Sequence, residues 1–350
     1  MSKRNLLDLT AIELKKAMQD LGLPAYRGDQ IFAWIYQKGI ARLEDMTNLP
    51  KGLREELCQD WYIGSMDTET VQVSKTDGTR KYLFRLSDGN AIESVLMRYH
   101  YGNTLCLSTQ AGCRMGCQFC ASTMEGLVRG LTAGEMVEQL LRVQQDTGER
   151  IGHLVLMGTG EPFDNYGEVA QFLRLAHEPG GLGISYRNMT VSTCGIVPQL
   201  SRFGEEFGQV GLAISLHGAT NVLRDRLMPV NRSYPLEVLL PAVKTYTEKT
   251  GRRVTFEYLL LGGVNDRAED LTQLIKALGI FHTTSGWQCH VNLIPWNRVS
   301  GKGYKPVSRQ KAEAFCQQLN QAGIPATVRR ELGSDIDAAC GQLRLGKTGN

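Results

Sequence analysis

From about residue 104, the sequence alternates between short apolar runs and longer stretches with apolar residues at helical spacing. The apolar runs cover 104–108, 154–157, 189–192, 212–215, 254–259 and 290–294, and the helical patterns cover 133–145, 166–176, 235–249, 270–278 and 309–322. This alternation predicts an α/β fold with a parallel sheet and crossover helices. Six units are too few for a closed eight-stranded barrel. We therefore predict an incomplete (β/α)6 barrel, with an open doubly wound sheet as the alternative.

The first hundred residues follow other patterns. Apolar positions at helical spacing predict helices over 11–21 and 29–37, and a further short helix follows Glu44 and Asp45. Over 71–96, apolar pairs alternate with Asp-Gly turn signals, which predicts a small antiparallel hairpin. We predict three parts, namely an N-terminal helical domain at 1–62, a β-hairpin connector at 63–100, and an α/β core with a C-terminal extension at 101–350.

Composition narrows the class of protein. The 350 residues are 42% hydrophobic and 21% charged with a net charge of +3, as in ordinary globular proteins. No apolar signal follows Met1 and no apolar run is long enough for a bilayer, so we expect a cytoplasmic monomer with no membrane partner. Basic residues gather toward the C-terminus, where they form either a solvated face or an RNA contact. They are Arg298, Lys302, Lys305, Arg309, Lys311, Arg329 and Arg330.

Three of the nine cysteines form a compact motif. The run Cys113-Arg-Met-Gly-Cys117-Gln-Phe-Cys120 has C-x3-C-x2-C spacing and follows the first predicted strand. Thiolates bind the iron of cubane clusters, and three ligands leave one iron open to a substrate. We predict a [4Fe–4S] cluster on these cysteines. The alternative is a zinc site completed by a distant His or Cys.

A glycine-rich turn follows the second predicted strand. Its sequence is Gly158-Thr-Gly160-Glu161-Pro162. Glycine lets a backbone approach a ligand closely, and a carboxylate can accept hydrogen bonds from an amine.

These motifs resemble the radical S-adenosylmethionine (SAM) superfamily, in which the open iron binds SAM and the cluster cleaves it to a 5′-deoxyadenosyl radical. The resemblance is closer to the RlmN/Cfr family of RNA adenosine methyltransferases and covers nearly the whole chain. It is carried by Tyr26-Arg-Gly-Asp-Gln-Ile31, Leu105-Cys106-Leu-Ser-Thr-Gln-Ala-Gly-Cys113, Ser215-Leu-His217, Leu227-Met-Pro229, Asn292-Leu-Ile-Pro-Trp-Asn297 and Gly333-Ser-Asp-Ile-Asp-Ala-Ala-Cys340.

The resemblance implies roles for three residues outside the cluster motif. Cys340 takes a methyl group from one SAM, and a second SAM at the cluster activates that methyl group to attack adenine. Glu93 then accepts the ring proton, and Cys106 releases the RNA by forming a disulfide with Cys340. From the residues alone, Cys106 and Cys340 also fit small buried apolar groups, and Glu93 fits a surface carboxylate.

The resemblance also implies the cofactor contacts and the partners. The implied SAM-binding residues are Gly160, Glu161, Ser192, Ser215, Leu216, His217 and Asn297. The implied substrates are 23S rRNA and, as a second candidate, the tRNA adenosine 3′ of the anticodon. An external electron donor such as flavodoxin and a thiol reductant complete the partners, and the N-terminal domain is implied to help bind RNA.

Some questions stay open at this point. Family members usually carry Met where this chain has Thr159, and Asn where it has Gly130. Glu161-Pro162 and Ile294-Pro-Trp296 resemble the RlmN branch, which methylates C2 of adenine, more than Cfr, which methylates C8. Two rival functions remain. One is a radical SAM enzyme with a non-RNA substrate, and the other is a zinc-binding RNA module without catalysis.

Overall fold

The computed structural model describes residues 3–338 and 341–343. Their main feature is one ten-stranded sheet with the order β16-β15-β12-β11-β10-β9-β6-β5-β4-β3. The parallel strands are β6 (Gly102–Cys106), β9 (His153–Leu156), β10 (Met189–Thr193), β11 (Gly211–Ser215), β12 (Val254–Leu260), β15 (Cys289–Pro295) and β16 (Ala326–Val328). The antiparallel strands are β3 (Asp67–Val73), β4 (Arg80–Arg85) and β5 (Ala91–Tyr99).

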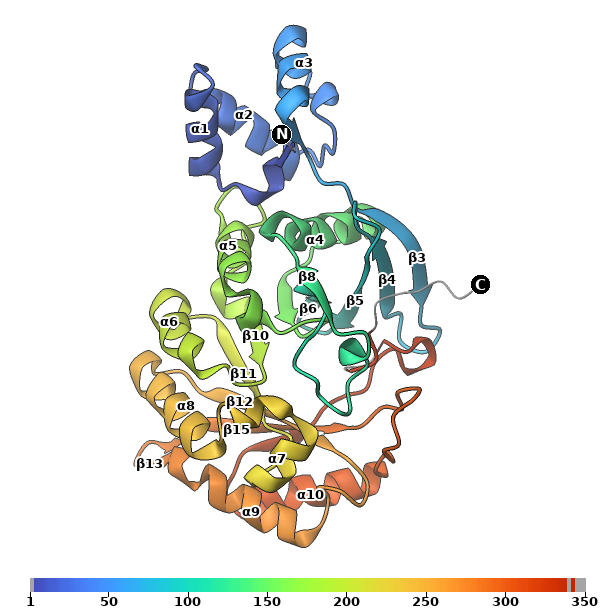
Figure 1. Cartoon of the computed structure of the whole chain (residues 1–350), viewed down its shortest axis with the longest axis vertical. Helices are drawn as coiled ribbons and strands as arrows, with labels where there is room; N and C mark the ends of the chain where they lie inside the picture. Colours follow the sequence, from blue (N-terminus) through green and yellow to red (C-terminus); the bar gives the residue numbers. More distant parts are fainter. Residues whose placement is uncertain (1–2, 339–340, 344–350) are drawn as a thin grey trace.

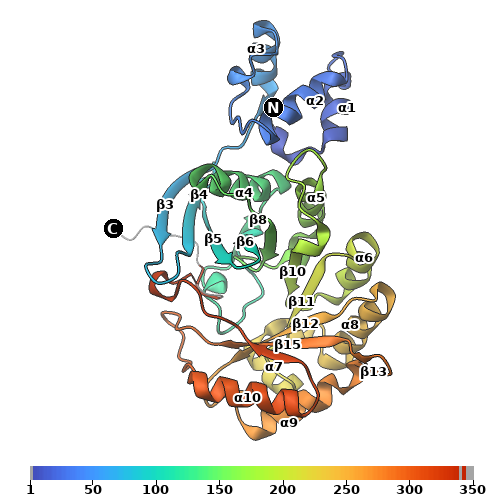
Figure 2. The same cartoon turned by 180° about the vertical axis from the view of Figure 1, so that it is seen from behind.

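Helices connect the parallel strands and lie on the outer side of the curved sheet (Figures 1 and 2). They are α4 (Ala133–Thr147), α5 (Tyr166–His177), α6 (Val197–Phe207), α7 (Asn221–Leu227), α8 (Leu236–Thr250), α9 (Ala268–Leu278) and α10 (Arg309–Gln321). The fold is therefore the partial barrel predicted from the sequence, and the doubly wound alternative is wrong. Among the helices that the structure describes, none has the length and apolar content needed to cross a membrane.

Three features of the sheet were not predicted. A seventh parallel strand, β16, pairs with β15 after α10. Helix α6 fills a connection for which no helix was predicted, and α7 adds a second helix to the connection for which only 235–249 was predicted to be helical. The predicted hairpin has three strands rather than two, and through β5 and β6 it continues the barrel sheet instead of forming a separate sheet.

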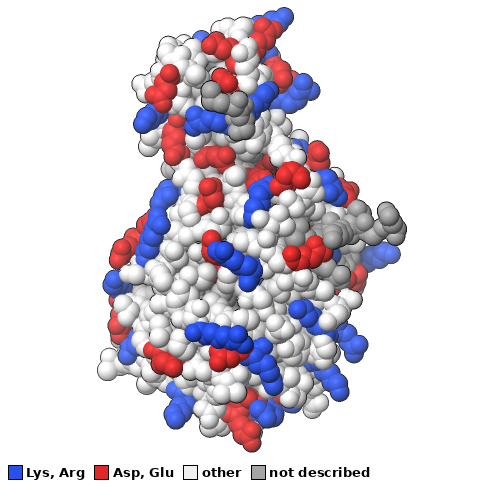
Figure 3. Space-filling model, viewed as in Figure 1, with Lys and Arg blue, Asp and Glu red and all other residues white. Residues whose placement is uncertain are grey.

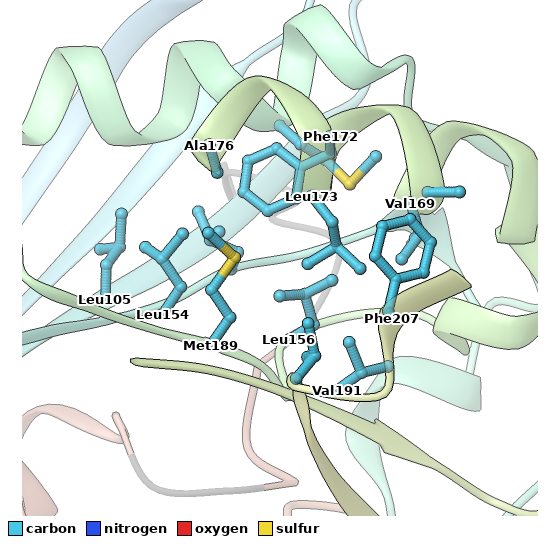
Figure 4. Close-up of a cluster of buried hydrophobic side chains, with 14 of the residues drawn as sticks. Leu105, Leu154, Leu156, Val169, Phe172, Leu173, Ala176, Met189, Val191 and Phe207 are labelled. Carbon is cyan, nitrogen blue, oxygen red and sulfur yellow. The ribbon is translucent and has the colours of Figure 1, made fainter. Parts of the chain in front are cut away.

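The core between sheet and helices is apolar. Figure 4 shows Phe172 and Leu173 of α5 packed over Leu154, Leu156 and Met189 of β9 and β10. All five side chains are at most 1% exposed. Burying each contributes about 1.5–3 kcal/mol, which fixes the strand ends that carry the site.

The N-terminal domain lies at one end of the barrel (Figure 1). It contains α1 (Ala11–Asp20), α2 (Tyr26–Tyr36) and α3 (Lys51–Asp60), as predicted, and a short parallel pair of β1 (Arg4–Asn5) and β2 (Trp61–Tyr62) that was not. A Cβ at Gly28 would lie 2.6 Å from the backbone nitrogen of Lys15, so glycine permits the close approach of α1 and α2. Asp8 accepts a hydrogen bond from Gly134 at the N-terminus of α4, where the helix dipole favours a carboxylate.

Candidate active site

The predicted cluster cysteines and all but two of the predicted cofactor residues meet in one cavity at the C-terminal ends of the parallel strands. The three motif cysteines belong to the loop between β7 (Gln110–Gly112) and β8 (Leu127–Gly130). The cavity brings together loops that are far apart in the sequence. Its predicted residues are Cys113, Cys117, Cys120, Gly160, Glu161, Ser192, Ser215 and His217.

The buried surroundings of the motif cysteines favour ligation of a metal cluster over free, solvated thiolates. Cys113 and Cys117 are 6% and 9% exposed. Burial, together with the charges of neighbouring groups that include the other motif cysteines, raises the pKa of Cys113 to about 12 and that of Cys117 well above its usual value. Bound iron would offset the cost of ionising these buried thiols, because a thiol that ligates a metal is deprotonated. Among the described residues, no three side chains surround a single ion. A cubane does not require that arrangement, because each thiolate binds a different iron.

Glu161 is held as a buried acceptor beside the thiols. Its carboxylate accepts hydrogen bonds from the backbone N–H groups of Phe163 at 3.0 Å and Cys194 at 2.8 Å. Burial raises the pKa of Glu161, and these hydrogen bonds oppose the rise. The side chains of Thr193 and Cys194 also hydrogen-bond to this carboxylate, which lines the cavity and can accept from a ligand amine there.

The glycine turn has a structural reason beyond ligand approach. A Cβ at Gly158 would lie 2.6 Å from the carbonyl oxygen of Leu107, and one at Gly160 would lie 2.7 Å from Oγ1 of Thr109. Gly160 also has a φ of +113°, a conformation that favours glycine. The missing side chains therefore admit the close approach of the neighbouring loop after β6.

His217 has an unusual backbone and a fixed orientation. Its φ is +54°, and its ring contacts Phe119 edge-to-face at 4.9 Å. Its Nδ1 accepts a hydrogen bond from the backbone N–H of Leu259. Burial, and secondarily the charge of Arg224, lowers the pKa of His217 to about 3. The imidazole is therefore neutral at physiological pH.

Arg224 connects the loops that carry the cavity residues, and no sequence motif predicts this role. Its side chain is fully buried and donates hydrogen bonds to the carbonyls of Ser215 at 3.0 Å, Leu216 at 2.6 Å and Cys194 at 3.2 Å. Burial lowers the pKa of Arg224 to about 10, so the guanidinium stays charged. It fixes the ends of β10 and β11 relative to each other.

Two predicted SAM contacts lie elsewhere. Leu216 is fully buried in the main hydrophobic core, and its backbone N–H donates to the carbonyl of Glu257. Asn297 follows β15 and lines a second, smaller cavity. Leu216 and Asn297 therefore do not line the larger cavity.

The second cavity contains Cys106 and adjoins the first. Cys106 ends β6, is 5% exposed, and lines the smaller cavity with Asn297. Met157, Ile294 and Arg329 line both cavities, so the two are separated only by shared side chains.

Cys340 itself lies outside the described residues, but its neighbours are placed. Ala338 and Leu343 belong to the same buried cluster as Cys106. The carbonyl of Gly341 accepts a hydrogen bond from the backbone of Ala121, directly after the last motif cysteine. The described residues on either side of Cys340 are therefore attached beside Cys106 and beside the cluster loop.

Glu93 lies on β5, and its surroundings include a lysine. It is 9% exposed, which does not match a surface carboxylate. Lys81 Nζ lies 3.5 Å from Glu93 Oε1, and both side chains are 12% exposed.

Sequence reasoning missed a carboxylate in the larger cavity. Glu257 interrupts the apolar strand β12, is 4% exposed, and accepts a hydrogen bond from Asn292 at 2.9 Å. Arg329 lies 4.0 Å from it and is therefore turned inward rather than presented to solvent. A charged residue in an otherwise apolar parallel strand is the signal that marks Glu257.

The two departures from the family pattern leave the cavity lining intact. Gly130 gives room to Asn165, since a Cβ there would lie 2.5 Å from the Asn165 side chain. Asn165 donates to the carbonyls of Thr109 and Leu131. Thr159 is 1% exposed and does not line the cavity, and its hydroxyl has no hydrogen-bond partner in the described part of the chain.

Comparisons with known proteins agree with this geometry. A family model described as "Radical SAM superfamily" matches residues 107–275, and one described as "Ribosomal RNA large subunit methyltransferase N-terminal domain" matches residues 4–63. The crystal structure of a radical SAM methyltransferase from Sphaerobacter thermophilus superposes with a TM-score of 0.91 at 44% identity, covering 98% of this chain and 99% of that one.

Full-length relatives are similar as well. A probable dual-specificity RNA methyltransferase RlmN from Geobacillus kaustophilus is 51% identical over 346 residues, covering 97% of this chain and 92% of the relative. The protein of the same description from Alkaliphilus oremlandii is 49% identical over 344 residues, covering 98% of both chains. The cluster loop, the cofactor cavity and this similarity along the whole chain place the protein in the RlmN family of radical SAM RNA methyltransferases.

Proposed function

We propose that this chain methylates C2 of an adenosine in 23S rRNA, and the tRNA adenosine 3′ of the anticodon as a second substrate. Its relatives carry "dual-specificity RNA methyltransferase" in their descriptions and match it almost end to end. The observation that carries the proposal is the packing around Cys106. Ala338 and Leu343, on either side of Cys340 in the sequence, share one buried cluster with Cys106. This is the arrangement that a thiol pair acting on one substrate requires.

The two adjoining cavities support separate sites for the cofactors and for the thiol chemistry. When bound, the [4Fe–4S] cluster and SAM supply a 5′-deoxyadenosyl radical, and the reaction consumes two SAM molecules per turnover. Cys113, Cys117 and Cys120 would hold the cluster. Glu161 would accept from the amine of SAM, and His217 would donate to SAM through Nε2–H. The shared wall between the cavities keeps the proposed SAM site next to Cys106.

The thiols and Glu93 would carry the substrate chemistry. Cys340, as a thiolate, accepts a methyl group and presents it to the adenine. Glu93 accepts the ring proton of the adduct, and Cys106 attacks the sulfur of Cys340 to release the RNA. A thiol reductant then restores the pair, and a one-electron donor such as flavodoxin serves the cluster.

We propose that RNA contacts charged residues spread over the surface of the protein rather than one basic patch. On the face seen in Figure 3, Lys and Arg side chains are interspersed with Asp and Glu. Such a surface suits recognition of RNA shape through scattered phosphate contacts, with the target base extruded into the cavity. We assign residues 1–62 an accessory role in this binding. The enzyme would act as a monomer in the cytoplasm, where both RNA substrates occur.

The test is methylation of defined RNA. Anaerobically reconstituted enzyme receives reductant, SAM and either a 23S rRNA fragment or tRNA, and digested RNA is measured by mass spectrometry. We expect 2-methyladenosine from the wild type and from Cys58→Ala, a cysteine in α3 outside the site, and none from Cys340→Ala. Formation of 8-methyladenosine would assign C8 chemistry instead. Formation of 5′-deoxyadenosine without methylation of either RNA would overturn the proposed substrate.

A further inference from the structure

Lys81 occupies a central position on the sheet face that carries Cys106. In the antiparallel register, Lys81 is opposite Val95 on β5, and Val95 is opposite Cys106 on β6. Opposed residues in a sheet point to the same face, so these three side chains form a row across three strands. Glu93 precedes Val95 by two positions on β5 and therefore points to the same face. Lys81, Glu93 and Cys106 therefore share one face.

The ammonium group of Lys81 makes two contacts with different functions. It lies 3.5 Å from Oε1 of Glu93 and donates to the carbonyl of Asp337 at 3.3 Å. Asp337 precedes Cys340 by only three residues. One lysine thus contacts both the candidate proton acceptor and the segment that leads to the candidate methyl carrier.

Further hydrogen bonds attach the same segment to the turn between β3 and β4. The backbone N–H of Gly333 donates to Asp77 at 2.9 Å, and that of Lys75 donates to Asp335 at 3.0 Å. A Cβ at Gly333 would lie 3.0 Å from the Thr79 side chain, so the contact is close. Among these contacts with the β3–β4 hairpin, the one made by Lys81 at Asp337 is the nearest to Cys340 in the sequence.

We propose that Lys81 is a positioning residue for the proton-transfer step, holding Glu93 as an oriented, ionised carboxylate and fixing it relative to the segment that carries Cys340. This inference rests on the proposed function. In the step, a C–H bond of the adenine adduct breaks, its electron pair stays in the ring, and the proton forms an O–H bond with Glu93. A nearby ammonium favours the charged form of the carboxylate before the step. It also disfavours retention of the proton afterwards, so the carboxyl group is returned to its ionised state by water.

Other charged groups share this environment and are common to every variant below. They lie on β3, β4, β6 and the segment that begins after β16. They are Arg85 with its partner Glu69, Cys106, Arg329, Arg330, Glu331, Asp335 and Asp337.

The experiment compares Lys81→Met, Lys81→Arg and the control Lys75→Met, which removes an exposed lysine from the same hairpin. Each reconstituted enzyme is assayed for methylation of Cys340 by intact mass, for 5′-deoxyadenosine, for methylated RNA across pH, and for covalent protein–RNA adduct on denaturing gels. We expect Lys81→Met to retain methylation of Cys340 and formation of 5′-deoxyadenosine. Its rate of RNA methylation should fall roughly tenfold or more. Its adduct should accumulate, and the acidic limb of its rate profile should move to higher pH. Lys81→Arg should restore both.

Lys81→Gln distinguishes the effect of the charge from that of the hydrogen bond to Asp337, because its side-chain amide is a neutral donor. This variant replaces Lys81→Met if Lys81→Met does not fold. An unchanged acidic limb and unchanged adduct level in the neutral variants would overturn the inference. So would an equal loss of Cys340 methylation and RNA methylation, which would indicate a structural role only. A wild-type enzyme that methylates no RNA would instead overturn the proposed function, which keeps the two failures distinct.

Discussion

The Nδ1 atom of His217 accepts a hydrogen bond from the backbone N–H of Leu259 at 3.0 Å. An acceptor nitrogen carries no proton, so the ring proton lies on Nε2 and the imidazole can donate into the cofactor cavity that it lines. A protonated ring would lose the bond to Leu259, which explains why a neutral histidine is built into this loop.

The first prediction concerns the stability of the metal-free protein at acid pH. The folded pKa of His217, about 3, lies below its ordinary value of 6.5. Between these values the unfolded chain binds more protons, so stability is complete above pH 6.5 and falls as the pH drops toward 3. Each pH unit in that window costs up to about 1.4 kcal/mol. Urea denaturation from pH 7.5 to 4.5 should show a shallower decline for His217→Asn. Equal slopes for the two proteins would contradict this account.

The second prediction concerns Arg224. Arg224→Met leaves the carbonyls of Ser215, Leu216 and Cys194 without their buried donor, so the free energy of unfolding should fall by about 3–5 kcal/mol. Chemical denaturation measures the change. The control is Arg226→Met, an exposed position on the same helix, which should stay within about 0.5 kcal/mol of the wild type. A similar small effect at Arg224 would show that its hydrogen bonds contribute little.

The third prediction concerns the glycine turn. Gly160→Ala adds a Cβ that meets Thr109 and Gln110 at a strained φ, so the free energy of unfolding should fall by about 1–3 kcal/mol. SAM binding, followed by isothermal titration of reconstituted enzyme, should weaken as well. Gly167→Ala is the matched control. It lies in α5 with open space around its Cβ position, and it should leave stability unchanged or raise it by up to about 1 kcal/mol.

The fourth prediction concerns product release. Cys106→Ala keeps the methyl carrier but removes the thiol that would free it, so a covalent protein–RNA adduct should accumulate while free methylated RNA falls. Denaturing gels with labelled RNA measure both. Cys316→Ala, which changes a half-buried cysteine of α10, should behave like the wild type. Full turnover by Cys106→Ala would remove Cys106 from the mechanism.

Most of the barrel is predictable because its strands and helices have local sequence patterns. Apolar runs predict the six central strands, and apolar residues at helical spacing predict most of the helices between them. The three residues of β16 are too short to give a signal, and pairing with β15 alone makes them a strand. The helix α6 has Leu200, Phe203 and Phe207 at helical spacing and Pro198 in its first turn, so this helix, which the sequence analysis leaves out, does carry a local signal.

The site was predictable only where residues are close in sequence or carry a family motif. The cluster cysteines and the glycine turn meet both conditions. Lys81 and Glu93 are twelve positions apart and meet through the register of β4 and β5, which no local pattern encodes. Arg224 acts on backbone carbonyls of two distant loops, and carbonyls are present at every residue, so its role depends entirely on the tertiary fold.

The C-terminal segment runs from β16, at one edge of the sheet, to the turn between β3 and β4, at the other edge. It thereby completes the ring that the strands leave incomplete (Figure 2). The closure consists of hydrogen bonds at Gly333, Asp335 and Asp337 and of the apolar packing of Leu332 and Ala338 in one buried cluster with Val95 and Met97, rather than a ladder of strand pairs. Detaching the described part of this segment would therefore break no bond of the sheet. The part of the ring that leads toward Cys340 is thus attached independently of the strand pairing, so a change in its contacts leaves the sheet on the cofactor side of the barrel intact.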